Sequence, residues 1–305
     1  MTPDNARAND TGLANLVLIK GAGDLASGVA LRLHHAGFPL VMTEIALPTS
    51  VRRTVCFSRA VTEKSAVVED VKAVLVDDDD DARGALHAGH LALYVDGEAG
   101  CVRRLRPAVL VDGIMAKRNV GTALTDAPVV IALGPGFIAG EDCHGVIETQ
   151  RGHTLGRVIT SGSALPDTGV PGDIGGHTTE RLIRAPCAGF FHPVVSIGDT
   201  VFAGDIAAVI FSQAPACPRC AGCTGSPDCS GCGLSPTAAG EPVVAQIDGM
   251  VRGILPEGMP VQAGMKCGDV DPRGERAHCF TVSDKALAVA GGVLEAILRF
   301  RAAGI

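Results

Sequence analysis

Tryptophan is absent from the 305 residues, tyrosine occurs once, and aromatic residues make up only 3% of the chain. An excess of basic charge is absent as well, since the formal net charge is -7. A nucleic-acid-binding surface needs clustered lysine and arginine. The sequence therefore predicts no nucleic-acid partner.

A long apolar run is also missing. Spanning a bilayer takes roughly 18 to 20 consecutive apolar residues, and no segment approaches that length. The first fifteen residues are polar and lack the apolar centre of a signal peptide. We therefore expect a cytoplasmic protein without a membrane partner.

Eleven cysteines are present although no export signal is. This combination argues against a disulfide framework and favours thiols with a metal, redox or chalcogen role. Five of them form one cluster, C-x2-C-x2-C-x5-C-x2-C, at Cys217, Cys220, Cys223, Cys229 and Cys232. Four thiolates would hold zinc, the closer run is also typical of iron-sulfur ligation, and a redox or persulfide relay is a third possibility.

A glycine turn follows the apolar run 16–19. Gly21 permits a tight turn, Gly23 allows close approach of a pyrophosphate, and Ala26 is small enough for helix and strand packing. Asp24 lies within the same turn. Glu44 closes the next apolar run about twenty residues later, where an acid would hold a ribose hydroxyl. The pattern predicts nucleotide binding, although such glycines can also serve packing alone.

Further short apolar runs at 67–76, 91–95, 108–112 and 129–133 predict buried strands of an open, mostly parallel sheet. Asp112 and Gly134 follow two of these runs, and Gly136 lies close by. Ligands bind at the carboxyl ends of strands in such sheets. Lys117 and Arg118 form a cationic pair suited to a phosphate or a pterin phosphate.

The segment 134–157 is dense in chemically active residues. Cys143 is the candidate reactive thiol, because nearby imidazolium or guanidinium groups favour a thiolate. His144, Glu148 and His153 complete the candidate catalytic set. The same residues could instead ligate a metal, and a buried structural cysteine is the plainer alternative.

An internal repeat at an offset of sixty residues begins after residue 180. Ala185, Gly189, Gly198, Val201, Ala203 and Gly204 recur as Ala245, Gly249, Gly258, Val261, Ala263 and Gly264. Such repeats usually mean two copies of one supersecondary unit. The rhythm resembles the halves of biotinyl and lipoyl carrier domains, but the stretch 211–241 between the halves holds no lysine to modify.

The predicted fold class is therefore α/β, a Rossmann-like mostly parallel sheet with a C-terminal barrel-sandwich-hybrid (biotinyl/lipoyl-like) β domain. We expect a nucleotide- or cofactor-binding domain over 1–165. The β domain should cover 166–280, with the cysteine-rich insert at 211–241. A C-terminal helix within 281–305 should pack on the core.

Several motifs together resemble the YqeB family. They are LIKGAGDLASG at 18–28, VDGIMAKRN at 111–119, LGPGF at 133–137, DCH at 142–144, IET at 147–149, RGHTLGRV at 151–158 and KCGDVDPR at 266–273. The similarity extends from about residue 15 to the C-terminus. The insert at 211–241 departs from the family pattern.

The resemblance implies an accessory or maturation factor for selenium-dependent molybdenum hydroxylases rather than the hydroxylase itself. It would handle a nucleotide or molybdopterin-type cofactor, or the sulfur or selenium ligand of molybdenum. Expected partners are the hydroxylase apoenzyme or other maturation proteins, and a small-molecule cofactor. An NAD(P)-dependent oxidoreductase and a non-catalytic scaffold are the alternatives, so enzymatic activity stays open.

Overall fold

The computed structural model describes residues 15–212 and 240–304, and the chain divides into two units. Unit 1 comprises Met1–Pro48, Val55–Gly169 and Thr281–Ile305, and unit 2 comprises Thr49–Thr54 and Val170–Phe280. The five clustered cysteines lie outside the described residues, so their metal or redox role stays a prediction.

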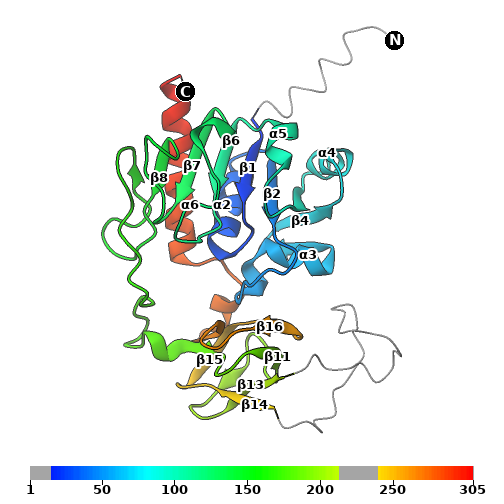
Figure 1. The fold of residues 1–305 in the computed structure, drawn as a ribbon, viewed down its shortest axis with the longest axis vertical. Helices are drawn as coiled ribbons and strands as arrows, with labels where there is room; N and C mark the ends of the chain where they lie inside the picture. Colours follow the sequence, from blue (N-terminus) through cyan, green and yellow to red (C-terminus); the bar gives the residue numbers. More distant parts are fainter. Residues whose placement is uncertain (1–14, 213–239, 305) are drawn as a thin grey trace. The chain divides into compact units, whose positions relative to one another are not determined.

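Unit 1 is built on a nine-stranded sheet with the order β3-β4-β5-β2-β1-β6-β7-β8-β9. The strands are β1 (Val17–Lys20), β2 (Leu40–Glu44), β3 (Ser65–Val68), β4 (Val71–Val76), β5 (Leu91–Val95), β6 (Val109–Asp112), β7 (Val129–Leu133), β8 (Gly145–Ile147) and β9 (Val158–Ile159). The pairs from β4 to β8 are parallel, whereas β3 and β9 pair antiparallel at the two edges. Figure 1 shows β1, β2, β6 and β7 in the middle of this sheet.

Both faces of the sheet are buried, as the continuous apolar runs predict. Along β1, Val17 and Ile19 face one core while Leu16 and Leu18 face the other. The first core is covered by α2 (Asp24–His35) and α6 (Asp284–Ala302), and the second includes residues of α4 (Asp79–His87) and α5 (Cys101–Leu105). The short α3 is Ala60–Glu63. Single-turn 3₁₀ helices lie at Arg53–Val55, Phe57–Arg59, Leu124–Asp126, Thr179–Arg181 and Arg276–Cys279.

Unit 2 consists of two four-stranded sheets with the orders β10-β17-β15-β12 and β14-β13-β11-β16, and all their pairs are antiparallel. The strands are β10 (Leu182–Arg184), β11 (Gly189–Pro193), β12 (Thr200–Val201), β13 (Ile206–Phe211), β14 (Glu241–Val244), β15 (Gly249–Ile254), β16 (Met259–Val261) and β17 (Lys266–Asp271). The sixty-residue repeat is visible here, because β10 to β13 are followed by β14 to β17 at that spacing. Gly189 and Gly249 even share φ values of 158° and 156°.

The predicted fold class is wrong. A doubly wound Rossmann sheet has the strand order 3-2-1-4-5-6, but here β5 rather than the preceding β4 adjoins β2, and the nine-stranded sheet is mixed. The run 67–76 was expected to be one strand. It is instead a hairpin of β3 and β4 that turns at Glu69, whose φ is 54°. The structure is mixed α/β, with a large parallel-rich sheet in unit 1 and two antiparallel sheets in unit 2, and not a Rossmann-like sheet with a carrier-like β domain.

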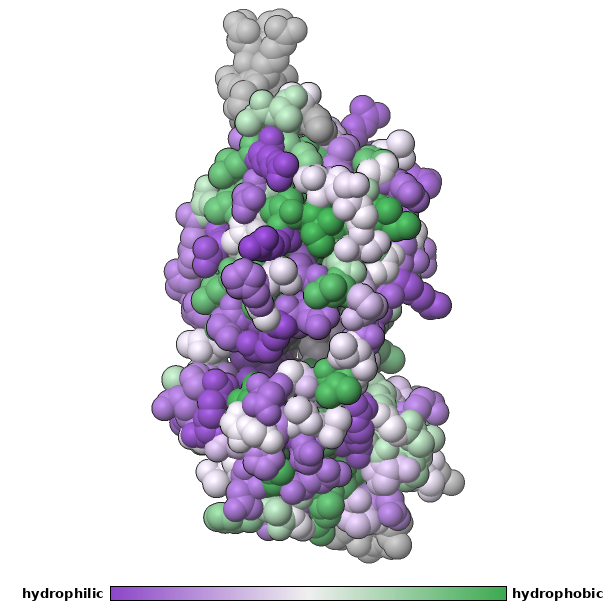
Figure 2. Space-filling model, turned by 90° about the vertical axis from the view of Figure 1, so that its left-hand side faces the viewer, coloured by the Kyte–Doolittle hydropathy of each residue, from purple (hydrophilic) through white to green (hydrophobic). Residues whose placement is uncertain are grey.

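Among residues 15–212 and 240–304, no helix is both long and apolar enough to cross a bilayer. On the face drawn in Figure 2, hydrophobic residues form separate patches between hydrophilic ones.

Helix α2 approaches α6 at a glycine, and this contact yields a stability prediction. A Cβ on Gly28 would lie 2.7 Å from the Cβ of Ala286, whereas a Cβ on the exposed Gly84 in α4 would meet nothing within 4 Å. We expect Gly28→Ala to lower the free energy of unfolding by about 1–3 kcal/mol through overpacking. The same change at Gly84 should raise it by about 0.5–1 kcal/mol through helix propensity.

Far-ultraviolet circular dichroism in urea measures both variants without relying on tryptophan. Equal stabilisation by the two substitutions would show that α2 and α6 do not make this contact.

Candidate functional site

The glycine turn lies where β1 meets α2, against the loop that follows β6. Gly21 has φ +87°, and a Cβ there would lie 3.1 Å from the Gly113 carbonyl oxygen. Gly23 is the N-cap of α2 and provides no side-chain cap, while Asp24 begins the helix. A Cβ on Gly113 would in turn lie 3.0 Å from the Cβ of Ala26. The structure thus brings together the two loops that the sequence assigned to one site.

Glu44 fixes the glycine turn through its carboxylate. One oxygen accepts a hydrogen bond from the Ala22 backbone N–H at 3.0 Å and the other from the Ile45 N–H at 2.8 Å. Burial raises the pKa of Glu44, and the two hydrogen bonds oppose that shift. Glu44 closes β2, as predicted, but its carboxylate already binds backbone groups. Its ribose role stays a prediction.

Asp112 belongs to a buried polar chain at the carboxyl end of β6. Its Oδ2 accepts a hydrogen bond from the Thr122 hydroxyl at 2.6 Å, and its Oδ1 accepts one from the Ile114 N–H at 3.1 Å. Lys20 donates to the same Thr122 hydroxyl oxygen at 2.7 Å. Sequence reasoning missed Lys20, although a lysine closing an otherwise apolar, buried strand is a recognisable signal.

The loop after β6 also crosses closely over the loop after β7. Gly136 has φ +105°, and a Cβ there would lie 2.5 Å from the Arg118 backbone N and Cα. Gly134, at φ +72°, leaves room for the Thr149 hydroxyl in the same way. Glycine is therefore required at both positions, as the predicted glycine turns imply.

The two predicted cations of this loop have different surroundings. Lys117 lies in the left-handed region with φ 61°, and its Nζ forms an ion pair with Asp167 Oδ2 at 2.6 Å. Arg118 is exposed, and within the described part of the chain it has no hydrogen bond or ion pair. Arg118 is thus available to a ligand.

The surroundings of Cys143 argue against a reactive thiolate. The residue is fully buried, and burial followed by the charge of Asp142 raises the pKa of its thiol to about 12. His144 does not activate it, because its Nδ1 accepts a hydrogen bond from the Val130 N–H at 2.9 Å. Burial also lowers the pKa of His144, so the ring is the neutral form at physiological pH. The predicted activation by imidazolium is absent from this geometry.

The remaining residues of the predicted catalytic set do not converge on Cys143. Glu148 is buried, and its two carboxylate oxygens accept hydrogen bonds from the Gln150 and Leu165 N–H groups at 2.7 and 2.8 Å. His153 is exposed. Over residues 15–212 and 240–304, no three His, Cys, Asp or Glu side chains are arranged to hold a metal ion.

Lys285, in the first turn of α6, is a second lysine that sequence reasoning left out of the site. Burial first, and then the charge of Arg151, lower its pKa, while Asp24 and Glu148 oppose that shift. Arg151 itself forms a two-pronged ion pair with Asp284 at 2.9 and 3.0 Å. An amine with a lowered pKa at the carboxyl edge of a sheet is a candidate functional group. It comes from about 260 residues beyond the glycine turn, so spacing could not reveal it.

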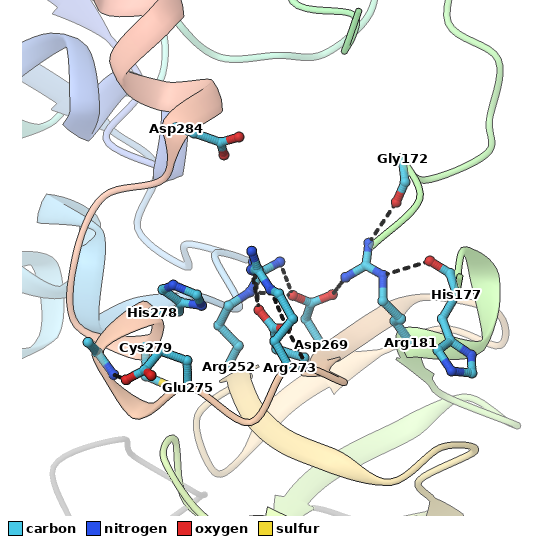
Figure 3. A network of polar contacts seen from close by, with 12 residues as sticks. Gly172, His177, Arg181, Arg252, Asp269, Arg273, Glu275, His278, Cys279 and Asp284 are labelled. Atoms are coloured by element: carbon cyan, nitrogen blue, oxygen red, sulfur yellow. Dashed lines mark hydrogen bonds and ion pairs between the residues drawn. The ribbon is translucent and has the colours of Figure 1, made fainter. Parts of the chain in front are cut away.

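Unit 2 has a separate polar network, drawn in Figure 3. Arg181 binds Asp269 Oδ1 at 2.9 Å, and Arg252 binds Asp269 Oδ2 at 2.8 Å. Burial would raise the pKa of Asp271, but hydrogen bonds from Arg273 and the charge of Arg252 lower it to about 2. At the matching positions of the first repeat copy, Asp269 and Asp271 are replaced by Val209 and Phe211. The repeat fold therefore forms without these charges.

No family model matches the chain. The chain is 47% identical over 290 residues to the uncharacterized protein YqeB of Escherichia coli (strain K12), a match that covers 95% of this chain and 48% of that protein. The chain thus spans about half the length of the curated relative it matches.

Solved structures resemble the chain only weakly. An aspartoacylase family protein from Mesorhizobium loti is 14% identical with a TM-score of 0.26, covering 84% of this chain and 85% of that one. A succinylglutamate desuccinylase/aspartoacylase from Rhodobacter sphaeroides is 14% identical with a TM-score of 0.25 and the same coverages.

The environment of Cys143 predicts slow alkylation. Among the six described cysteines, Cys187 alone is not buried. We expect an alkylating reagent at pH 8 to modify Cys187 in the native protein while Cys143 reacts only after unfolding, because both access and thiolate are lacking. Mass mapping with and without urea measures this order. Faster native labelling of Cys143 would restore its predicted role as a reactive thiol.

The lowered pKa of Lys285 predicts a pH-dependent stability change. The folded state binds the Lys285 proton less tightly than the unfolded state, so the charged amine opposes folding. That penalty is present below the folded-state pKa and disappears as pH rises to the ordinary value of 10.5. We expect Lys285→Met to raise the free energy of unfolding at pH 7, with the gain shrinking as pH approaches 10.5.

Chemical denaturation across this pH range tests the prediction, with Lys72→Met on the exposed side of β4 as the matched control. A gain that is independent of pH, or one that Lys72→Met shares, would contradict it.

Proposed function

We propose that this chain, whose relationship to the YqeB family is supported by 47% identity over 290 residues, is an accessory or maturation factor for selenium-dependent molybdenum hydroxylases. It handles the molybdenum cofactor or the sulfur or selenium ligand of the metal. Its partners are the hydroxylase apoenzyme or other maturation proteins. The match covers about half of YqeB, so the role is proposed for the part that this chain represents.

One observation carries the cofactor-handling part of the proposal. The loops after β1, β6 and β7 meet at a single edge of the sheet through contacts at Gly21, Gly113 and Gly136. This edge presents the start of α2, where backbone N–H groups and the helix dipole favour a phosphate. The exposed Arg118 guanidinium adds donors suited to a phosphate oxygen. A nucleotide or molybdopterin-type cofactor supplies such a phosphate.

The residues of this edge would bind and orient the cofactor. Glu44 holds the glycine turn through the Ala22 N–H, and Asp167 holds Lys117 in the loop beside Arg118. Cys143 is not assigned the chalcogen, because its thiol is buried and no cation among the described residues lowers its pKa. The cysteine cluster at 217–232 is predicted to bind zinc or an iron-sulfur cluster or to act as a redox or persulfide relay, and through that third alternative it is the proposed place for sulfur or selenium chemistry.

The NAD(P)-dependent oxidoreductase alternative is less well supported. It would need the Glu44 carboxylate for the ribose, and both oxygens of that carboxylate accept backbone N–H groups. A non-catalytic scaffold differs from our proposal in one respect, since a scaffold would not depend on Arg118.

Co-expression with a selenium-dependent molybdenum hydroxylase tests the function. We expect the wild-type chain to raise the selenium content and activity of the purified hydroxylase. Arg118→Ala should weaken cofactor binding about tenfold or more, because a hydrogen bond to a charged group contributes about 1.5–3 kcal/mol. Maturation should fall accordingly, whereas Lys72→Ala should match the wild type.

Equal selenium content with and without the chain would refute the maturation role. Full maturation with Arg118→Ala, together with capture of the hydroxylase, would favour the scaffold alternative instead.

A further inference from the structure

The ammonium group of Lys20 is buried at the carboxyl end of β1 with unused hydrogen-bonding capacity. Its side chain is only 6% exposed, and its Nζ donates to the Thr122 hydroxyl oxygen at 2.7 Å. Asp112 Oδ2 is 3.9 Å away, beyond hydrogen-bond distance. An ammonium carries three N–H donors. Two of them therefore have no acceptor among the described residues.

Asp112 is held where it cannot supply the missing acceptor. The Thr122 hydroxyl lies between the two charges, accepting from Lys20 and donating its own proton to Asp112 Oδ2 at 2.6 Å. The other carboxylate oxygen accepts the Ile114 N–H. Thr122 is itself fixed, because its backbone N–H donates to the Asn119 side chain at 2.8 Å. The Thr122 hydroxyl thus keeps the Lys20 ammonium beyond hydrogen-bond distance of the Asp112 carboxylate, although the two charges remain 3.9 Å from each other.

Burying an ammonium whose N–H donors lack acceptors lowers the stability of the folded state, unless a further group accepts those hydrogen bonds. A buried charge with unmet donors is unfavourable, and direct contact between Lys20 and Asp112 would relieve both groups. Lys20 directly precedes Gly21, and Asp112 directly precedes Gly113, the two glycines that bring the loops together. The unused donors are therefore found at the same strand ends as the proposed cofactor site.

We propose that Lys20 is a binding residue for a tetrahedral oxyanion, with its two unused N–H groups donating to oxygens of a phosphate or of a molybdate-type oxo group. This inference deepens the proposed function and rests on it for the nature of the ligand. Thr122 and Asp112 act as positioning residues that aim the ammonium. Because Asp112 matches the charge of Lys20, the pair is neutral, and the bound oxyanion is held mainly by the hydrogen bonds that the ammonium donates.

Calorimetric titration of the full chain with inorganic phosphate, and separately with molybdate, tests the proposal. We expect the wild type to bind phosphate, molybdate or both. The matched control Lys72→Met should bind the same anion with the same affinity as the wild type. Asp112→Asn should bind more tightly than the wild type, because it removes a negative charge beside the oxyanion and keeps an acceptor for Thr122. The double variant K20M/D112N should lose affinity tenfold or more, because the donors are gone while the site stays neutral.

Circular dichroism shows which variants are folded, and the neutral double variant avoids the unpaired buried carboxylate that Lys20→Met alone would leave. Preference for phosphate assigns the site to a phosphate group of the ligand, and preference for molybdate assigns it to an oxo-metal group. Failure of the wild type to bind either oxyanion, or unchanged binding by K20M/D112N, overturns the proposal. The titration needs no hydroxylase, so its failure is distinguishable from failure of the maturation role.

Discussion

The close approach of three loops at the carboxyl edge of the unit 1 sheet is the constraint on which the candidate site depends. Because β1, β6 and β7 pair in parallel, the loops that follow them leave the sheet at the same edge. Parallel pairing does not by itself bring the backbones of these loops into contact. Backbone contact is possible because Gly21, Gly113 and Gly136 have no Cβ. Met115 and Lys117 adopt left-handed φ values in the same region, and non-glycine residues hold such values only where surrounding contacts enforce them. The contacts between these loops thus account both for the left-handed φ values and for the shape of the candidate site.

The sequence allowed prediction of the parts of the site that follow directly after strands. Gly21, Asp112 and Gly134 lie at strand ends as expected, because an apolar run bounded by a breaker marks both the strand and its end. Lys20 and Lys285 were missed for different reasons. Lys20 lies between the apolar run 16–19 and the glycine turn, and neither pattern assigned it a role. Lys285 reaches the edge through the packing of α6 beside α2, a contact between residues about 260 positions apart that no periodicity encodes.

The fold class could not be predicted because the order of strands in the sheet depends on the positions of hairpins, and the sequence pattern did not reveal the hairpin of β3 and β4. Glu69 and Asp70 interrupt an apolar run by only two residues, yet the resulting turn creates an antiparallel edge strand and places β4 outside β5. The surroundings of Cys143 differ from the expected ones for a related reason. The neighbours in sequence include histidine, arginine and glutamate, but the thiol is buried, His144 accepts a hydrogen bond from the Val130 N–H, and His153 is exposed. Proximity along the chain did not become proximity in space.

The interleaving of the two units has a consequence for how the chain folds during synthesis. Unit 1 receives its last helix, α6, only after every residue of unit 2 has been made. Until then, the sheet face that α6 covers, including Ile131 and Ile147, stays open to solvent. Unit 2 can therefore finish first on the ribosome although it lies later in the chain, and the half-built unit 1 is the species that would engage a chaperone.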